Sequence, residues 1–133
     1  MKNVIFTTIV VFLMASCATT TKFPVSLVVP AAEITVKVTK EKQANFLVDI
    51  NANRLANPQR LTPPKSVYVA WIVTRENSIK NIGMLNVQNA EKASLKTLTP
   101  FEPFEIFITA EHEGAISYPS GVEIARMNVS RFK

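Results

Sequence analysis

The stretch from Ser66 to Thr74, Ser-Val-Tyr-Val-Ala-Trp-Ile-Val-Thr, decides the fold of this chain. Most of its side chains are β-branched or aromatic, and these residue types favour extended strands. Apolar residues occupy both of the alternating sets of positions, so both faces of the strand must be covered. The pattern predicts either a central strand of a sandwich or a strand whose outer face is covered by another segment.

The segments on either side of this strand alternate between apolar and polar side chains, which indicates half-buried strands. In residues 33–39, for example, Ile34, Val36 and Val38 fall on one face. Further strands are expected at 46–50, 79–87, 93–98, 104–110 and 121–129, with loops at 51–65 and 111–120. The eight prolines fall between these strands or at their starts, where a missing amide does least harm.

Seven or so short strands at this spacing, without a convincing helical period after residue 17, predict an all-β domain. We expect an antiparallel β-sandwich, immunoglobulin-like in a broad sense, over residues 23–133. A small β-barrel is the alternative all-β architecture. The length suits one domain and not two.

Residues 1–16 have the composition of an export signal. Lys2 gives a positively charged start, residues 4–14 form an apolar run, and Ala15 and Ser16 are small. The run fits the roughly 7–15-residue core of a signal peptide and is shorter than the roughly 20 residues that span a bilayer as a helix. We therefore expect residues 1–16 to be an N-terminal signal helix that is cleaved off.

Cys17, the only cysteine, follows directly, and residues 13–17 (Leu-Met-Ala-Ser-Cys) resemble the lipobox of bacterial lipoproteins. This resemblance implies lipidation of Cys17, with residues 17–22 as the lipidated cysteine and a polar tether. It also implies attachment to a membrane of the bacterial cell envelope, on its periplasmic or surface side. A plain secretory signal followed by a chance cysteine is the alternative.

The residue types that most catalytic and metal sites need are scarce. His112 is the only histidine, and its neighbours Glu111 and Glu113 read as solvated loop residues. Lipidation leaves no free thiol, Asp49 is the only aspartate, and three glycines cannot supply a phosphate-binding loop. The acidic residues Glu33, Glu105 and Glu123 fall on polar strand faces. We expect no enzymatic activity, no cofactor and no metal site.

The charge and the aromatic residues narrow the classes of partner. The net charge of +5 is spread along the chain, without the clustered basic footprint of nucleic-acid-binding proteins. Trp71 is expected in the core, because a tryptophan in the middle of a central strand usually packs inside a sandwich. A ligand-binding platform would instead need its ring exposed. The loop 111–120, with Tyr118, is a better candidate for a binding tip, since loops carry function on sandwiches.

Several short motifs also resemble a known family. Residues 68–73 (Tyr-Val-Ala-Trp-Ile-Val), Gly83, residues 107–111 (Phe-Ile-Thr-Ala-Glu) and residues 119–121 (Pro-Ser-Gly) occur in that order. This succession resembles the extracytoplasmic C-terminal domain of anti-sigma-K factors, over roughly residues 66–129. The resemblance implies a sandwich. The cytoplasmic sigma-binding module and transmembrane helix of that family have no counterpart here, so only an outer, signal-sensing domain carries over.

These observations lead to an expected function. The first hypothesis is a lipid-anchored, non-enzymatic interaction or accessory module that binds an envelope protein, and the alternative is a surface lipoprotein that binds glycan or another small ligand. A hydrolase with an unrecognised site is the third. An uncovered strand edge favours the first hypothesis, an exposed aromatic pair beside a hollow the second, and His112 in a pocket with two distant acids the third.

Overall fold

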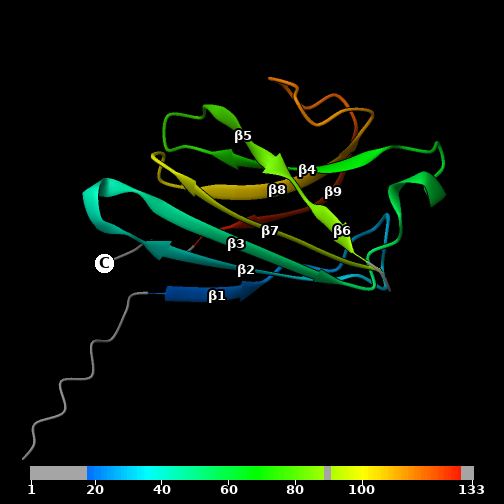
Figure 1. Ribbon diagram of the computed structural model, residues 1–133, viewed down its shortest axis with the longest axis horizontal. Helices are drawn as coiled ribbons and strands as arrows, with labels where there is room; N and C mark the ends of the chain where they lie inside the picture. The colour runs from blue at the N-terminus through cyan, green and yellow to red at the C-terminus, as the bar shows by residue number, and fades with distance from the viewer. Residues whose placement is uncertain (1–17, 89–90, 130–133) are drawn as a thin grey trace, which may run out of the picture.

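The computed structural model describes residues 18–88 and 91–129, which form two antiparallel β-sheets packed face to face (Figure 1). The first sheet has the strand order β1 (Ala18–Lys22), β2 (Glu33–Lys40), β3 (Phe46–Asn53), β7 (Lys92–Thr99) and β6 (Asn86–Gln88). The second has the order β5 (Ile79–Met84), β4 (Val67–Val73), β8 (Glu105–Glu111) and β9 (Val122–Asn128). Two short 3₁₀ turns, η1 (Lys42–Ala44) and η2 (Pro58–Arg60), lie in connections.

This strand order is that of an immunoglobulin-like sandwich. Strands β2, β3, β7 and β6 take the places of A, B, E and D, and β4, β8 and β9 take those of C, F and G. Strand β5 is the additional strand beside C, and β1 extends the first sheet past A. The predicted all-β, immunoglobulin-like sandwich is confirmed, and the described strands form two separate sheets rather than a closed barrel.

The inner faces of both sheets form the main core. The alternation predicted for β2 is exact in the structure, because Ile34, Val36 and Val38 are all buried. Tyr68 is also fully buried in this core, and its hydroxyl donates a hydrogen bond to the Ala56 carbonyl oxygen at 2.6 Å. Burial raises the pKa of Tyr68 to about 12, so the phenol stays neutral.

Strand β4 is buried on its outer face as well. Val69, Trp71 and Val73 form a second apolar cluster there with Phe107 of β8. The rings of Trp71 and Phe107 stack with centroids 6.2 Å apart. Ile116, in the loop between β8 and β9, packs against this cluster, and Figure 1 shows that loop arching over β4. Trp71 is therefore buried as predicted, but under a loop and not between the sheets.

The polar tether expected over residues 17–22 is wrong for Ala18–Lys22. These residues form β1, which pairs antiparallel with β2 from Ala18 opposite Thr39 to Lys22 opposite Thr35. Three consecutive threonines favour the extended conformation, and the edge of β2 offers them backbone partners. Residues 18–22 are thus part of the first sheet, ahead of the domain start expected at Phe23. The predicted signal helix and Cys17 lie outside the described residues.

One predicted strand is divided between the two sheets. Residues 79–87 form β5 in the second sheet and β6 in the first, with buried Leu85 between them. The chain bends near Gly83, whose φ of +131° is one that only glycine adopts without strain. Strand β3 also runs on to Asn53, three residues further than predicted.

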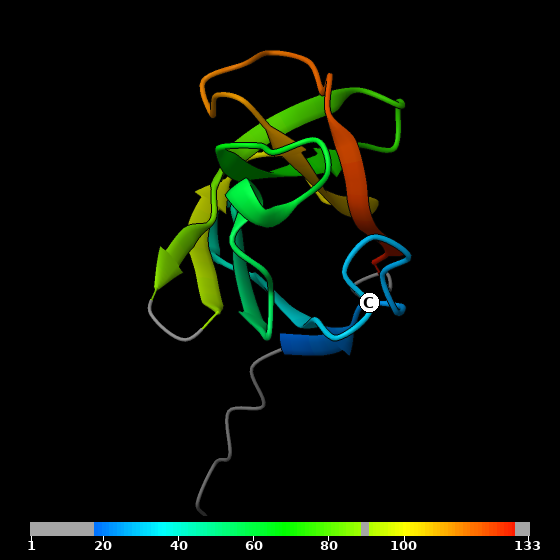
Figure 2. The same ribbon diagram turned by 90° about the vertical axis from the view of Figure 1, so that its right-hand side faces the viewer.

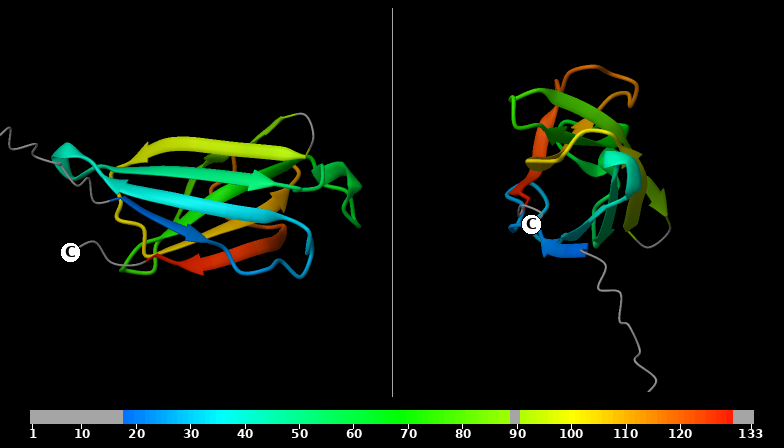
Figure 3. Two further views of the ribbon diagram at one scale, coloured as in Figure 1. Left: turned by 90° about the horizontal axis from the view of Figure 1, so that it is seen from below. Right: turned by 90° about the vertical axis from the view of Figure 1, so that its left-hand side faces the viewer.

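The register places the longer described connections at the two ends of the sandwich. Because Ala18 lies opposite Thr39, the start of β1 shares one end with residues 41–45, 74–78 and 100–104, which we call the N-terminal pole. The other end, the distal pole, holds residues 23–32, 54–66 and 112–121. Figure 2 views the distal pole, and the left panel of Figure 3 shows η1 and η2 at opposite ends.

The buried position of Trp71 generates a first prediction. Trp71→Ala should lower the free energy of unfolding by about 3–5 kcal/mol, because it empties the space between β4 and the covering loop. Trp71→Phe keeps a ring against Phe107 and should cost less. Chemical denaturation of the domain from residue 18 onward measures both changes. Unchanged stability of Trp71→Ala would contradict the assignment of Trp71 to a packed cluster.

Candidate functional site

The connection between β1 and β2 carries the most exposed apolar side chains of the described chain. In this segment, residues 24–32, which we call the apolar loop, Leu27 is 97% exposed, Val25 71% and Val28 39%. Isolated apolar residues are common on protein surfaces, but here three of them lie within four positions of one short loop. Such groups of exposed apolar residues mark sites where another molecule binds.

The apolar loop is held in one conformation. Buried Ser26 accepts hydrogen bonds through Oγ from the amides of Val28 at 3.1 Å and Val29 at 3.0 Å. The Ala32 amide donates to the Val29 carbonyl at 3.1 Å, and Phe23, just before the loop, donates its amide to the Ile34 carbonyl at 2.8 Å. A loop that is already ordered loses little entropy when it binds a partner.

Two flanking apolar residues anchor this segment in the core. Phe23 and Val29 are 4% and 7% exposed and belong to the main apolar cluster. The exposed positions Val25, Leu27 and Val28 lie between them. The segment therefore separates its apolar residues into two groups, one that holds the loop in place and one that faces solvent.

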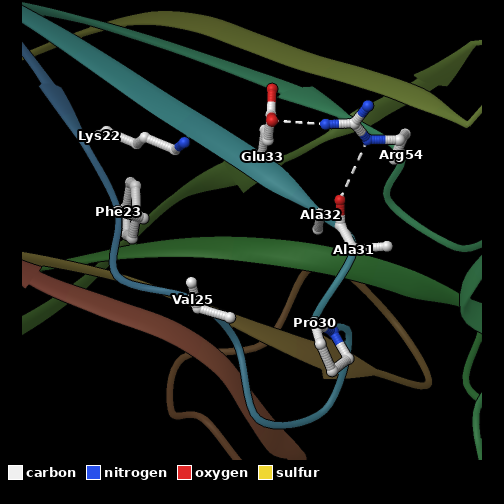
Figure 4. Close-up of a pocket in the computed structure, with 8 residues that line it drawn as sticks. All are labelled: Lys22, Phe23, Val25, Pro30, Ala31, Ala32, Glu33 and Arg54. Atoms are coloured by element: carbon white, nitrogen blue, oxygen red, sulfur yellow. Dashed lines mark hydrogen bonds and ion pairs between the residues drawn. The ribbon is translucent and has the colours of Figure 1, made fainter.

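A hollow of about 360 Å³ lies beside the apolar loop (Figure 4). The residues that line it are Lys22, Phe23, Val25, Pro30, Ala31, Ala32, Glu33 and Arg54. Arg54 pairs with Glu33 and donates Nε to the Ala31 carbonyl at 3.3 Å, so it ties the end of β3 to the loop. Figure 4 shows both contacts. The result is an apolar surface with a charged rim.

A second group of polar residues is buried under the loop 112–121. Trp71 donates Nε1–H to Thr109 Oγ1 at 2.9 Å, and Thr109 donates its hydroxyl to Glu111 Oε2 at 2.5 Å. Ser120 donates its hydroxyl to Glu111 Oε1 at 2.9 Å, and its amide lies 3.3 Å from both carboxylate oxygens. The Glu111 carboxylate thus links β4 and β8 to the end of the loop.

These donors set the ionisation of Glu111. Burial by itself raises the pKa of this carboxyl, but hydrogen bonds from Thr109, the Gly121 amide and Ser120 outweigh that effect and leave the pKa below its ordinary value of 4.5. Glu111 is therefore a carboxylate at neutral pH. Gly121 is required here, because a Cβ on it would lie 1.8 Å from the Ala110 carbonyl oxygen.

The sequence-based interpretation of Glu111 as a solvated loop residue is wrong. Glu111 ends β8 and is 1% exposed, because its side chain alternates to the covered face of the sheet together with Thr109. Its spacing of two from Thr109 on an apolar strand is the signal that could have revealed this. Trp71, Thr109, Glu111, Ser120 and Gly121 meet in this one network.

The other residues considered from sequence do not gather into a reactive centre. His112 and Glu113 are exposed, and residues 18–88 and 91–129 hold no group of three His, Cys, Asp or Glu side chains that could bind a metal ion. Glu33 pairs with Arg54, while Glu105 and Glu123 both pair with Arg126. Full burial of Trp71 leaves it no ligand-binding face. Tyr118, in contrast, is 69% exposed in the loop considered as a binding tip.

Comparisons with protein-family models, with curated proteins and with solved structures give no match for this chain. None of the helices in the described part of the chain has the length and hydrophobicity needed to cross a membrane.

The Glu111 network generates a second prediction. Glu111→Gln should cost about 1–3 kcal/mol of stability at pH 7, because it removes the charge that four donors surround. A lowered folded-state pKa stabilises the protein above pH 4.5, and this stabilisation is lost as the pH falls below 4.5. The variant should therefore lose less stability than wild type between pH 5 and pH 3 in denaturation experiments.

The matched control for this experiment is His112→Ala, one position further along. His112 is exposed, so this change should alter stability by less than about 0.5 kcal/mol at pH 7. Equal effects of the two substitutions would contradict the assigned role of Glu111. A stoichiometric metal that disappears with His112→Ala would contradict the expectation that His112 binds none.

The apolar loop generates a third prediction. Leu27→Asp should change the free energy of unfolding by less than about 0.5 kcal/mol, because the side chain is already in water. Val29→Asp, two positions away, should cost several kcal/mol, because it buries a carboxyl without a partner. Thermal denaturation followed by circular dichroism compares the two. Strong destabilisation by Leu27→Asp would show that Leu27 is part of the core.

Proposed function

We propose that this protein is a lipid-anchored, non-enzymatic interaction module of the bacterial cell envelope, which binds another envelope protein through the apolar loop. The observation that carries the proposal is the 97% exposure of Leu27 in a loop that Ser26 holds rigid by two hydrogen bonds. Keeping such a side chain in water brings the isolated domain no gain in stability. A partner surface that covers it gains the free energy of its burial.

The surroundings of Leu27 support a protein as the partner. Protein interfaces combine an apolar centre with a polar, solvent-accessible rim. Val25, Leu27 and Val28 provide such a centre, and Lys22 with the Arg54–Glu33 pair provides such a rim. The hollow next to Val25 is large enough to receive one or two side chains of a partner, which is how binding hot spots are usually built.

The position of the loop also fits a protein held at a membrane by Cys17. Cys17 precedes Ala18, which lies at the N-terminal pole, whereas the apolar loop lies at the distal pole. A lipid attached to Cys17 places the bilayer at one end of the sandwich and leaves the apolar loop facing away from it. The loop is then accessible to envelope proteins.

The non-enzymatic part of the proposal is supported by how the acidic groups are used. The buried carboxylate of Glu111 is fully occupied by donors that fasten the loop 112–121. Glu33, Glu105 and Glu123 are paired with arginines on the surface. His112 is exposed to solvent. A hydrolase needs a group free to transfer protons, and these carboxylates serve structural contacts instead.

The proposal predicts that membrane attachment depends on Cys17 and that binding of the partner protein depends on the apolar loop. Cys17→Ala should move the protein from the membrane fraction to the soluble fraction, because no acyl chains remain. His112→Ala should leave it in the membrane fraction. A photo-crosslinking residue at position 27 should form a discrete protein adduct in the native bacterium, and one at position 59 of η2, also exposed at the distal pole, should not.

Three results would contradict the proposal. Retention of Cys17→Ala in membranes, with no loss of lipid label, would exclude anchoring through Cys17. Crosslinks from position 27 to lipid alone would assign the apolar loop to the bilayer. The absence of any protein adduct at position 27, together with crosslinking to glycan, would favour the surface lipoprotein that binds a small ligand.

A further inference from the structure

A second exposed apolar group lies at the N-terminal pole, in the connection between β7 and β8. Residues 100–104 read Pro-Phe-Glu-Pro-Phe, and we call them the phenylalanine loop. Phe101 is 42% exposed, Phe104 is 39% exposed, and Leu98 at the end of β7 is 61% exposed. Neither the apolar loop nor the proposed partner accounts for this patch, because both belong to the other end of the sandwich.

Backbone contacts hold the phenylalanine loop in place. The Phe101 amide donates to Thr99 Oγ1 at 3.2 Å, and the Phe104 amide donates to the Val73 carbonyl at 2.8 Å. The Phe104 carbonyl accepts a hydrogen bond from the Val129 amide at 2.9 Å. Buried Pro103 separates the two rings along the chain. The rings are thus presented on a fixed support and not on a disordered segment.

The register fixes how far this patch lies from the lipid attachment point. Ala18 is opposite Thr39, Thr39 is opposite Leu47, and Leu47 is opposite Leu98. Three strand spacings separate Ala18 from Leu98, which amounts to about 14 Å. Cys17 is the residue next to Ala18, about 3.8 Å away between Cα atoms. Because β1 leaves no free tether, an acylated Cys17 brings the bilayer to this pole.

The charges at this pole indicate the kind of contact. Among the described residues, those at this pole include Lys40, Lys42, Arg75 and Lys80 together with Glu41, Glu76 and Glu102, so the two signs of these side chains nearly balance. The Lys80 ammonium lies 4.9 Å from the centroid of the Phe101 ring. A balanced surface gains little from anionic lipids, so apolar side chains must provide the contact.

Resting on the proposed lipidation of Cys17, we propose that the N-terminal pole lies on the bilayer, with Phe101 and Phe104 inserted among the lipid headgroups. The acyl chains then provide attachment, and the phenylalanine loop fixes orientation. Such a contact depends on apolar insertion, and it should therefore vary little with salt concentration or with the fraction of anionic lipid.

The test uses the full lipidated chain in phosphatidylcholine vesicles. Lipidation occupies the only native thiol, so a single new cysteine can carry an environment-sensitive fluorophore. Glu102→Cys places it between the two phenylalanines, and Gln59→Cys places the matched control at the distal pole; both residues are exposed. Lipid-borne quenchers at headgroup depth should quench the probe at 102 severalfold more than the probe at 59, because only a loop inserted about 5–10 Å into the headgroup region brings its fluorophore within reach of them.

A further variant tests the two rings directly. Phe101→Ser with Phe104→Ser should markedly reduce quenching at position 102, because the loop no longer inserts, while leaving the protein bound to the vesicles through its acyl chains. Raising the salt concentration to 0.5 M should not change the quenching of the probe at position 102 in the chain that keeps both phenylalanines. Equal quenching at 102 and 59, stronger quenching at 59, or quenching at 102 that the double substitution leaves unchanged would each overturn the proposed insertion of the phenylalanine loop.

The outcome for the orientation can be separated from the outcome for the anchor. Mass spectrometry of Cys17 before the measurement establishes whether the chain carries lipid. An unmodified Cys17 would overturn both the anchor and the docking proposal. A lipidated chain without selective quenching at 102 would overturn the docking proposal alone, and the crosslinking at Leu27 would still test the partner.

Discussion

The burial of both faces of β4 is the constraint on which the rest of this fold depends. Its inner face packs against the first sheet. Its outer face carries Trp71 and two valines, which another segment must cover. The loop 112–121 supplies that cover through Ile116, and Asn81 of β5 holds it by donating to the carbonyls of Gly114 and Ile116, each at 2.8 Å. The carboxylate of Glu111 fastens its far end. A buried carboxylate thus holds in place the loop that covers the apolar cluster.

The sequence predicts the parts of this structure that depend on local patterns. Local patterns identify strands at the places of β2, β3, β4, β7, β8 and β9, and a single strand where the structure has β5 and β6. The spacing of these strands identifies the sandwich. The sequence does not reveal Ala18–Lys22 as a strand. Its partners in β2 are distant, since Lys22 pairs with Thr35 and Ala18 with Thr39, and polar threonines carry no hydrophobic signal. The sequence does not reveal the burial of Glu111, because the donors to its carboxylate at Ser120 and Gly121 approach it only when the loop folds back. Val25 and Leu27 resemble core residues in the sequence, and only the fold shows that they face solvent.

The two poles of the sandwich differ in what they expose. The distal pole presents aliphatic side chains on a loop fixed by Ser26, beside a rim that includes Arg54. The N-terminal pole presents two phenylalanines at the same end of the sandwich as the start of β1. Both sets are attached to rigid backbone, so neither results from loose packing of the domain. The two exposed apolar surfaces thus lie at opposite ends of the molecule. The strands of both sheets run from one end to the other (Figure 3).

The pairing of β1 with β2 has a consequence for how such a protein finds what it binds. A lipoprotein on a long flexible tether samples a large volume above its membrane. Here the eight residues of β2 set the height of the domain at about 25 Å, and pairing from Ala18 removes the slack that a tether provides. With Cys17 acylated as proposed, the apolar loop is confined to a thin shell at that height. Targets outside the shell are out of reach, whereas a protein embedded in the same membrane meets the loop at a high local concentration by lateral diffusion alone.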